Sequence, residues 1–183
     1  MRNNYLLSFL LAMLCFFSNQ TFSQRDSTTH VSIKQRNAIL NALKDQIDKE
    51  YGIRQGIPRI NLGPCGPFAK AFYDEWNARF SDKVIIAFVM RNHTDKPNCP
   101  HIVVKLPDGN YYDGGMGVMT DSVLLSQFPN CRIEDMNVFD MSLLERNAYG
   151  LTRKYQLCPN YTNEWTIATI RKYLDILIKK TEG

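Results

Sequence analysis

One apolar run constrains the fold of this chain more than any other feature. From Val84 to Met90 the sequence Val-Ile-Ile-Ala-Phe-Val-Met contains no polar side chain. The side chains of a strand alternate between two faces, so a run of this length that is apolar throughout is typical of a strand buried on both faces. We therefore predict a central strand here, covered by other elements on both sides.

A β-hairpin is predicted after this strand. The residues from His101 to Leu106 alternate between two faces, which predicts a half-buried strand. Pro107-Asp108-Gly109-Asn110 is a strong turn signal. Tyr111-Tyr112-Asp113 then forms the returning strand, and Gly114-Gly115 ends it.

Apolar side chains recur at helical spacing in three further segments. The first ends at Gly52, the second begins at Cys65, and Asn163 caps the third. Helices before and after a small antiparallel sheet predict an α+β domain, with the helix that begins at Cys65 packed on the sheet. We interpret the aromatic stripe of this helix as core. The apolar positions are Leu40, Leu43, Ile47 and Tyr51, then Phe68, Phe72, Trp76 and Phe80, and finally Ile167, Ile170, Leu174 and Leu177.

Three shorter elements are predicted between the hairpin and the last helix. Thr120 or Asp121 can cap a short helix through Leu125. The segment from Ile133 to Phe139 is predicted to hold a strand. The segment from Ser142 to Asn147 is predicted to form another helical turn or two.

The N-terminus has the features of a signal peptide. Arg2 precedes an apolar run from Tyr5 to Phe17, which is shorter than the roughly 18 apolar residues of a membrane-spanning helix. Thr21 and Ser23 are the small residues that a signal peptidase accepts before Gln24. We therefore expect cleavage before Gln24 and a secreted or periplasmic protein without a stable membrane anchor.

The mature chain has a suitable length for one domain. Removal of residues 1–23 leaves about 160 residues, enough for a single core. We expect residues 24–30 to form a flexible mature N-terminus and residues 31–183 to form the domain. The whole chain carries 22 basic and 18 acidic side chains, without a block of like charge. This small excess argues against nucleic acid as a partner.

Cys65, His101 and Asp113 have the chemistry of a nucleophile, its base and the residue that orients the base. Cys65 lies at the predicted start of a helix, where the helix dipole and free backbone N–H groups lower a thiol pKa. The glycines and prolines around it leave room for a substrate carbonyl. The other histidines, His30 and His93, lie in polar segments and are not expected in a site.

The length of the hairpin loop decides whether Asp113 can reach His101. With a three-residue loop, Val103 pairs with Asp113, which then lies on the face of His101 and diagonal to it. With a two-residue loop, Asp113 pairs with Val104 and points to the opposite face. The catalytic arrangement therefore requires an odd loop or a bulge.

Two motifs carry a family resemblance. They are Gly-Pro-Cys-Gly-Pro-Phe-Ala at the helix start and Cys-Pro-His-Ile-Val-Val-Lys-Leu-Pro-Asp-Gly-Asn-Tyr-Tyr-Asp-Gly-Gly along the hairpin. Together they resemble the core of the papain-like superfamily, and most closely its transglutaminase-like branch. The resemblance implies Cys65, His101 and Asp113 as catalytic residues. It also implies an acyl-enzyme reaction, hydrolysis or transfer, on amide bonds of a protein, a peptide, peptidoglycan or a glutamine side chain.

The chain departs from this family at the oxyanion position. Papain-type peptidases place a glutamine a few residues before the cysteine, and no glutamine stands there in this sequence. Asn61 is the nearest amide and the candidate for the oxyanion role; the alternative is a polar loop residue without that role. The departure weakens the case for a papain-type peptidase more than the case for an amidase or acyltransferase.

Four cysteines remain after the signal: Cys65, Cys99, Cys131 and Cys158. Because the protein is expected to be exported, we predict a disulfide between Cys131 and Cys158 and a free catalytic thiol. The even number also allows two disulfides, which would favour a stapled binding or inhibitory domain without catalysis. Zinc held by Cys99, His101 and the other two catalytic candidates is a third alternative, with an unusual ligand spacing. We expect no metal and no cofactor.

Overall fold

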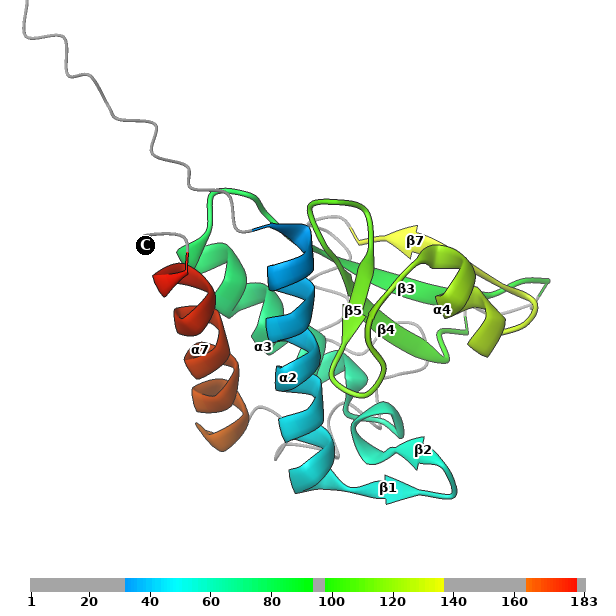
Figure 1. Cartoon of the computed structure of the whole chain (residues 1–183). Helices are drawn as coiled ribbons and strands as arrows, with labels where there is room; N and C mark the ends of the chain where they lie inside the picture. Colours follow the sequence, from blue (N-terminus) through cyan, green and yellow to red (C-terminus); the bar gives the residue numbers. More distant parts are fainter. Residues whose placement is uncertain (1–31, 94–97, 137–163, 181–183) are drawn as a thin grey trace, which may run out of the picture.

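The computed structural model describes residues 32–93, 98–136 and 164–180, which form a mixed α+β fold (Figure 1). The α+β prediction is therefore confirmed at the level of fold class. In chain order the elements are α2 (Ile33–Tyr51), β1 (Ile53–Arg54), β2 (Ile57–Pro58), the short 3-10 helix η1 (Arg59–Asn61), α3 (Cys65–Arg79), β3 (Ile85–Arg91), β4 (His101–Lys105), β5 (Tyr111–Asp113), β6 (Gly117–Met119), α4 (Asp121–Gln127), β7 (Cys131–Asp135) and α7 (Glu164–Lys179).

The main sheet has five antiparallel strands in the order β6-β5-β4-β3-β7. The strand β3 pairs with β4 on one side and β7 on the other. Its side chains from Ile86 to Met90 are buried on both faces. The prediction of an internal, doubly buried strand is confirmed.

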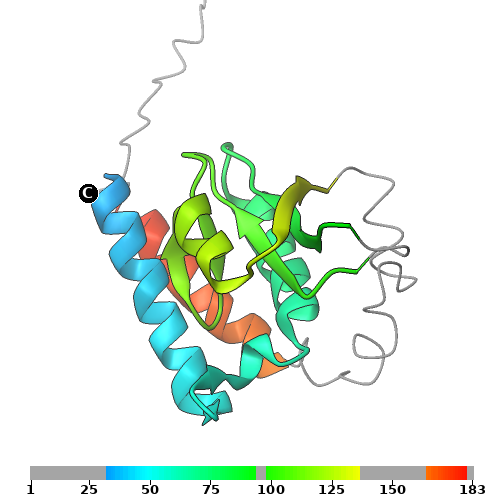
Figure 2. The same ribbon diagram turned by 90° about the vertical axis from the view of Figure 1, so that its right-hand side faces the viewer.

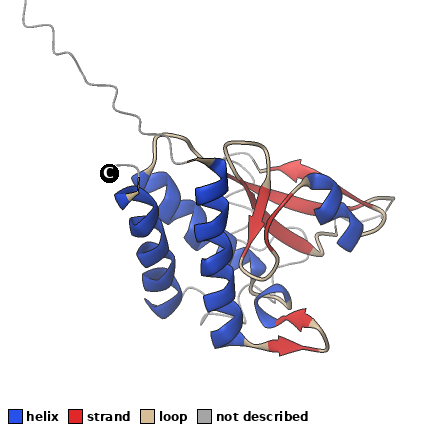
Figure 3. Ribbon diagram, in the orientation of Figure 1, coloured by secondary structure: helices blue, strands red, loops and turns tan. Residues whose placement is uncertain are grey.

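One face of the sheet packs on a layer of three helices. The helices α2 and α3 contact the strands, and α7 packs against both of these helices. Figure 1 and Figure 3 show the three helices together on one side of the strands. The predicted aromatic stripe of α3 is core: the Phe72 ring lies 4.9 Å from the Tyr112 ring and 5.6 Å from the Trp76 ring. This contact holds the helix that begins at Cys65 against the hairpin strands.

The opposite face of the sheet has its own apolar cluster. Leu124 of α4 and Met119 of β6 bury Val103 on this face, together with Val89 of β3 and Tyr111 of β5. Figure 2 shows α4 in front of the strands and α7 behind them. The prediction of a half-buried strand from His101 to Leu106 is therefore wrong, because both faces of β4 are covered.

The helix α2 holds the hairpin in place from one side. Arg36 forms an ion pair with Asp108 in the hairpin loop at 2.5 Å. The Tyr112 hydroxyl donates to the Leu40 carbonyl at 3.1 Å, and the Asn41 side-chain oxygen accepts from the Val118 N–H at 3.0 Å. The first two contacts hold the hairpin of β4 and β5, at whose end Asp113 lies, and the third holds β6.

Element boundaries agree with the sequence patterns in part. The first helix ends as predicted at Gly52, which has φ of 75°. Thr120 caps α4 as predicted, because its side chain accepts from the Val123 N–H. The strand predicted from Ile133 begins earlier, at Cys131. The strands β1, β2 and β6 were not predicted, because two- and three-residue strands have too few positions for a recognisable alternation.

Several predictions concern residues outside the described part of the chain. They are the signal peptide and the mature N-terminus, the helical turns from Ser142 to Asn147, the cap at Asn163 and one cysteine of the proposed disulfide, Cys158. These predictions stand as they were made from the sequence.

Candidate active site

Cys65 is the first residue of α3, as its sequence context predicts. No side chain caps the N-terminus of this helix, so the N–H groups of its first turn have no side-chain acceptor from a capping residue. Burial raises the pKa of the Cys65 thiol, but the charge and hydrogen bonding of His101 and the Ile102 N–H lower it by more, so its pKa lies below the ordinary value. The environment therefore favours a thiolate.

The hairpin loop has the length that the site requires. The Leu106 N–H donates to the Asn110 carbonyl at 2.7 Å, and the three residues between them form the turn. Tyr112 pairs with Val104. Continuing this antiparallel register by one residue places Asp113 opposite Val103. The prediction that a three-residue loop places Asp113 on the same face as His101 is confirmed.

His101 is buried and bonded at one ring nitrogen to Asp113. Its Nε2 lies 2.7 Å from Oδ2 of Asp113, and both side chains are at most 2% exposed. The other nitrogen, Nδ1, is buried and has no well-formed hydrogen bond among the described residues. The Cys65 thiol acts on the imidazole through its charge and through hydrogen bonding. Burial lowers the pKa of His101, but Cys65 and Asp113 raise it by more, so the net shift is upward. An imidazolium beside a thiolate is therefore the favoured pair.

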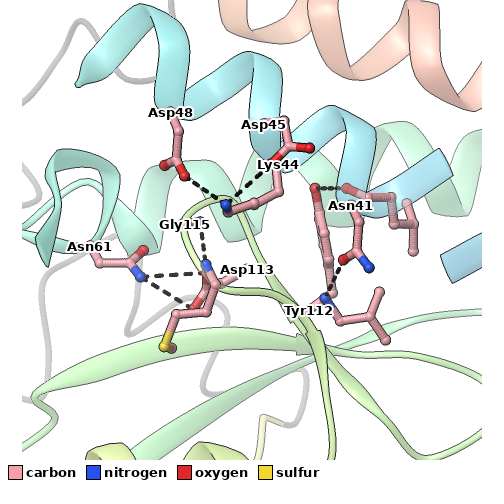
Figure 4. Close-up of polar contacts among 11 residues, drawn as sticks. Asn41, Lys44, Asp45, Asp48, Asn61, Tyr112, Asp113 and Gly115 are labelled. Atoms are coloured by element: carbon pink, nitrogen blue, oxygen red, sulfur yellow. Dashed lines mark hydrogen bonds and ion pairs between the residues drawn. The ribbon is translucent and has the colours of Figure 1, made fainter. Parts of the chain in front are cut away.

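Asp113 is held by hydrogen bonds from several directions. Its Oδ1 accepts from the Gly115 N–H at 2.7 Å and also from the Met116 N–H. The Asn61 amide nitrogen lies 3.4 Å from both carboxylate oxygens (Figure 4). The turn after β5 therefore fixes one oxygen of Asp113 and leaves the other for His101.

Asn61, the candidate oxyanion donor, lies next to Asp113. An oxyanion donor must point at the carbonyl that Cys65 attacks. The amide nitrogen of Asn61 points at Asp113, while its oxygen is buried and has no hydrogen-bond partner among the described residues. The structure therefore associates Asn61 with the acidic residue of the site.

Cys99 is near the site but has the opposite chemistry from Cys65. Its buried thiol donates to the His101 carbonyl at 3.0 Å. Burial, and then the charge of Cys65, raise the pKa of Cys99 far above its ordinary value. Cys99 is therefore held as a neutral thiol and is a poor nucleophile.

The described cysteines, Cys65, Cys99 and Cys131, are not bridged to one another. Cys65 and Cys99 are buried, and Cys131 is partly exposed on β7. The disulfide from Cys131 to Cys158 stays a prediction, because Cys158 lies outside the described residues. Within residues 32–93, 98–136 and 164–180, no three His, Cys, Asp or Glu side chains are grouped as metal ligands.

Three neighbours of the site were not assigned to it from the sequence: Phe128, Gly115 and Met116. The Phe128 ring stacks on the His101 imidazole, with centroids 5.0 Å apart and an angle of 14° between the planes. No sequence signal identifies such a contact, because Phe128 follows a short helix far along the chain. The turn donors Gly115 and Met116 were detectable, since an aspartate before Gly-Gly is typical of a turn that bonds its own backbone.

Comparisons of the chain with protein-family models, curated proteins and solved structures find no match. In the part of the chain that the structure describes, no helix has the length and apolar character needed to cross a membrane.

The substitution His101→Gln is expected to slow alkylation of Cys65 by iodoacetamide at neutral pH. The pKa of Cys65 would rise without the imidazolium, because burial alone raises it. The alkylation rate of the wild type should therefore rise with pH at a lower midpoint than that of an ordinary thiol. The midpoint for His101→Gln should lie at higher pH than the midpoint for the wild type. Mass spectrometry of the Cys65 peptide across a pH series measures both midpoints. The control His93→Gln should behave as wild type, since His93 is exposed; equal midpoints for wild type and His101→Gln would contradict the pairing.

Proposed function

We propose that this protein is an exported enzyme with a cysteine nucleophile that acts on amide bonds through an acyl-enzyme. The observation that carries the proposal is the buried hydrogen bond of 2.7 Å between His101 and Asp113, together with the electrostatic interaction between His101 and Cys65. Nucleophile, base and orienting group occur in the order that such catalysis needs. The finer fold is proposed to be papain-like, of the transglutaminase-like branch.

The proposed reaction uses the Cys65–His101 pair twice. The thiolate attacks the substrate carbonyl, and the imidazolium gives its proton to the leaving amine, so a thioester forms and the amide bond breaks. Neutral His101 then takes a proton from water or from an acceptor amine, which attacks the thioester and releases the thiolate. Water gives hydrolysis or deamidation, and an amine gives acyl transfer. Asp113 keeps the imidazole oriented in both steps.

The burial of the site affects how a substrate can reach it. Cys65, His101 and Asp113 are 3%, 1% and 2% exposed. A substrate must therefore displace atoms that cover the sulfur before the carbonyl can approach. A slender acyl group, such as a glutamine side chain or an extended peptide, needs less displacement than a folded surface. The proposed substrates are accordingly a protein or peptide chain or a peptidoglycan stem, and not a nucleic acid.

A small activated ester tests the proposal. With p-nitrophenyl acetate, the protein is expected to release a burst of p-nitrophenol and then turn over slowly, because the thioester forms faster than it hydrolyses. Mass spectrometry of quenched protein should find the acetyl group on the Cys65 peptide. Acetyl groups spread over lysines, with none on Cys65, would contradict the proposal.

The alternative function is a disulfide-stapled binding or inhibitory domain. It predicts that Cys65 is half of a disulfide, and that Cys65→Ser unfolds the protein. The free thiol on Cys65 and the lowered pKa of that thiol favour the nucleophile. Peptide mapping under non-reducing conditions separates the two, since a fully bridged Cys65 would support the alternative.

Export is expected to leave a mature chain that begins near Gln24. Signal peptidase accepts small residues such as Thr21 and Ser23 at the positions before its cut. Intact-mass analysis of exported protein should therefore show loss of residues 1–23 and no added lipid. A lipid-modified N-terminus at Cys15 would be the contrary result.

A further inference from the structure

We propose that Asn61 is a positioning residue: it holds the Asp113 carboxylate in place for His101 and is not the oxyanion donor. This inference rests on the proposed function and deepens it, because it assigns a role to a residue outside the catalytic pair. Its basis is the direction of one side chain, seen in Figure 4.

The two halves of the Asn61 amide have different surroundings. The nitrogen lies 3.4 Å from each oxygen of Asp113, so it bridges the carboxylate. The oxygen is buried and finds no hydrogen-bond partner in the described part of the chain. The opposite orientation would place an amide oxygen against the carboxylate, where two acceptors face each other. The carboxylate therefore determines which half of the amide points at it.

Asn61 packs closely against the turn at Gly115. A Cβ atom on Gly115 would lie 2.7 Å from the Asn61 nitrogen and 2.7 Å from Cβ of Pro58. The absence of a side chain at Gly115 thus allows Asn61 to reach the turn after β5. Because the Gly115 N–H also donates to Asp113, the same turn contacts both partners.

This placement links the nucleophile segment to the acidic residue. Asn61 ends η1, a few residues before Cys65, whereas Asp113 ends a strand of the sheet. A contact between them fixes the hairpin relative to the start of α3. If the contact is lost, Asp113 can move, and His101 then no longer faces Cys65 at the best angle.

Alkylation by iodoacetamide separates a positioning role from an oxyanion role. The thiolate displaces iodide from a saturated carbon, forming a C–S bond and releasing iodide, so no oxyanion develops. Loss of an oxyanion donor leaves this reaction unchanged. Loss of positioning slows it, because fewer molecules hold the Cys65 thiolate beside the His101 imidazolium.

The experiment is a double-mutant cycle with Asn61→Ala and Asp113→Asn, followed by iodoacetamide alkylation of Cys65 at neutral pH. Asn61→Ala alone is expected to slow the reaction about tenfold, the effect of losing one hydrogen bond to a charged group. When Asp113→Asn is already present, adding Asn61→Ala should slow the alkylation by less than about a further threefold, because both residues act through the same contact. If Asn61→Ala does not fold, Asn61→Ser takes its place, because serine keeps a hydrogen-bond donor. Its alkylation rate is expected to lie between those of the wild type and of a variant without a donor.

A matched control and two contrary results complete the test. Asn41→Ala removes a neighbouring contact, to the Val118 N–H, that does not touch the catalytic groups, and should alkylate at the wild-type rate. A wild-type rate in Asn61→Ala, or losses that multiply fully with Asp113→Asn, would overturn the inference. A wild-type Cys65 that resists alkylation would instead overturn the proposed function, so the two failures are distinguishable.

Discussion

Cys65→Ala is expected to abolish turnover of p-nitrophenyl acetate or an amide probe and to leave the fold intact. The Cys65 sulfur is the atom that bonds to the acyl carbon in the proposed thioester, so turnover should fall on the order of 10⁴-fold or more. The side chain is small and buried at the start of α3, so the change in the free energy of unfolding should be only about 1 kcal/mol. Steady-state kinetics and a thermal melt by circular dichroism measure the two effects.

Cys99→Ala is the matched control for this variant. It makes the same chemical change at a buried thiol that donates to the His101 carbonyl. Turnover should therefore persist. Equal losses in the two alanine variants, or turnover that survives in Cys65→Ala, would show that the thiol of Cys65 is not the nucleophile.

Asp113→Asn is expected to reduce turnover on the order of 10³- to 10⁴-fold and to destabilise the fold by about 1–3 kcal/mol. The carboxylate uses one oxygen for the Gly115 and Met116 N–H groups and the other for His101. An amide has only one acceptor oxygen, so its NH₂ group must face either the turn donors or the imidazole. In the first orientation the hydrogen bonds from the turn N–H groups are lost. In the second orientation the NH₂ group favours the wrong tautomer of His101.

Asp135→Asn controls for the loss of a carboxylate from the same sheet. Asp135 forms an exposed ion pair with Lys105, which contributes little to stability and is not part of the site. Kinetics and urea unfolding of both variants provide the comparison. If Asp113→Asn behaved like Asp135→Asn, the buried pair with His101 would have no role in turnover.

The relation between His101 and Asp113 was predictable because hairpin geometry is local. Two short strands and a loop of known length determine which side chains share a face, whatever packs around them. The sequence left two loop lengths open, and the Leu106–Asn110 hydrogen bond selects the longer. The position of Cys65 was predictable for the same reason, since a helix start is a local feature.

The surroundings of these residues were not predictable to the same degree. Burial of β4 on both faces depends on α4 and β6, which reach it only in the folded protein. The stacking of Phe128 on His101 likewise joins residues that are distant in the chain. Such contacts cannot be recognised from periodicity in a single sequence. The periodicity of apolar residues indicates the type of one element but not which other element packs against it.

By itself the sequence determined the α+β class, the main helices, the internal strand and the candidates Cys65, His101 and Asp113. Only the tertiary structure decided that His101 is bonded to Asp113, that Asn61 points to the acidic residue, and that Cys99 stays a neutral thiol. The physical reason is that local patterns depend on backbone geometry and side-chain periodicity. The direction of an amide and the ionisation of a thiol depend instead on which charges and donors the fold places around them.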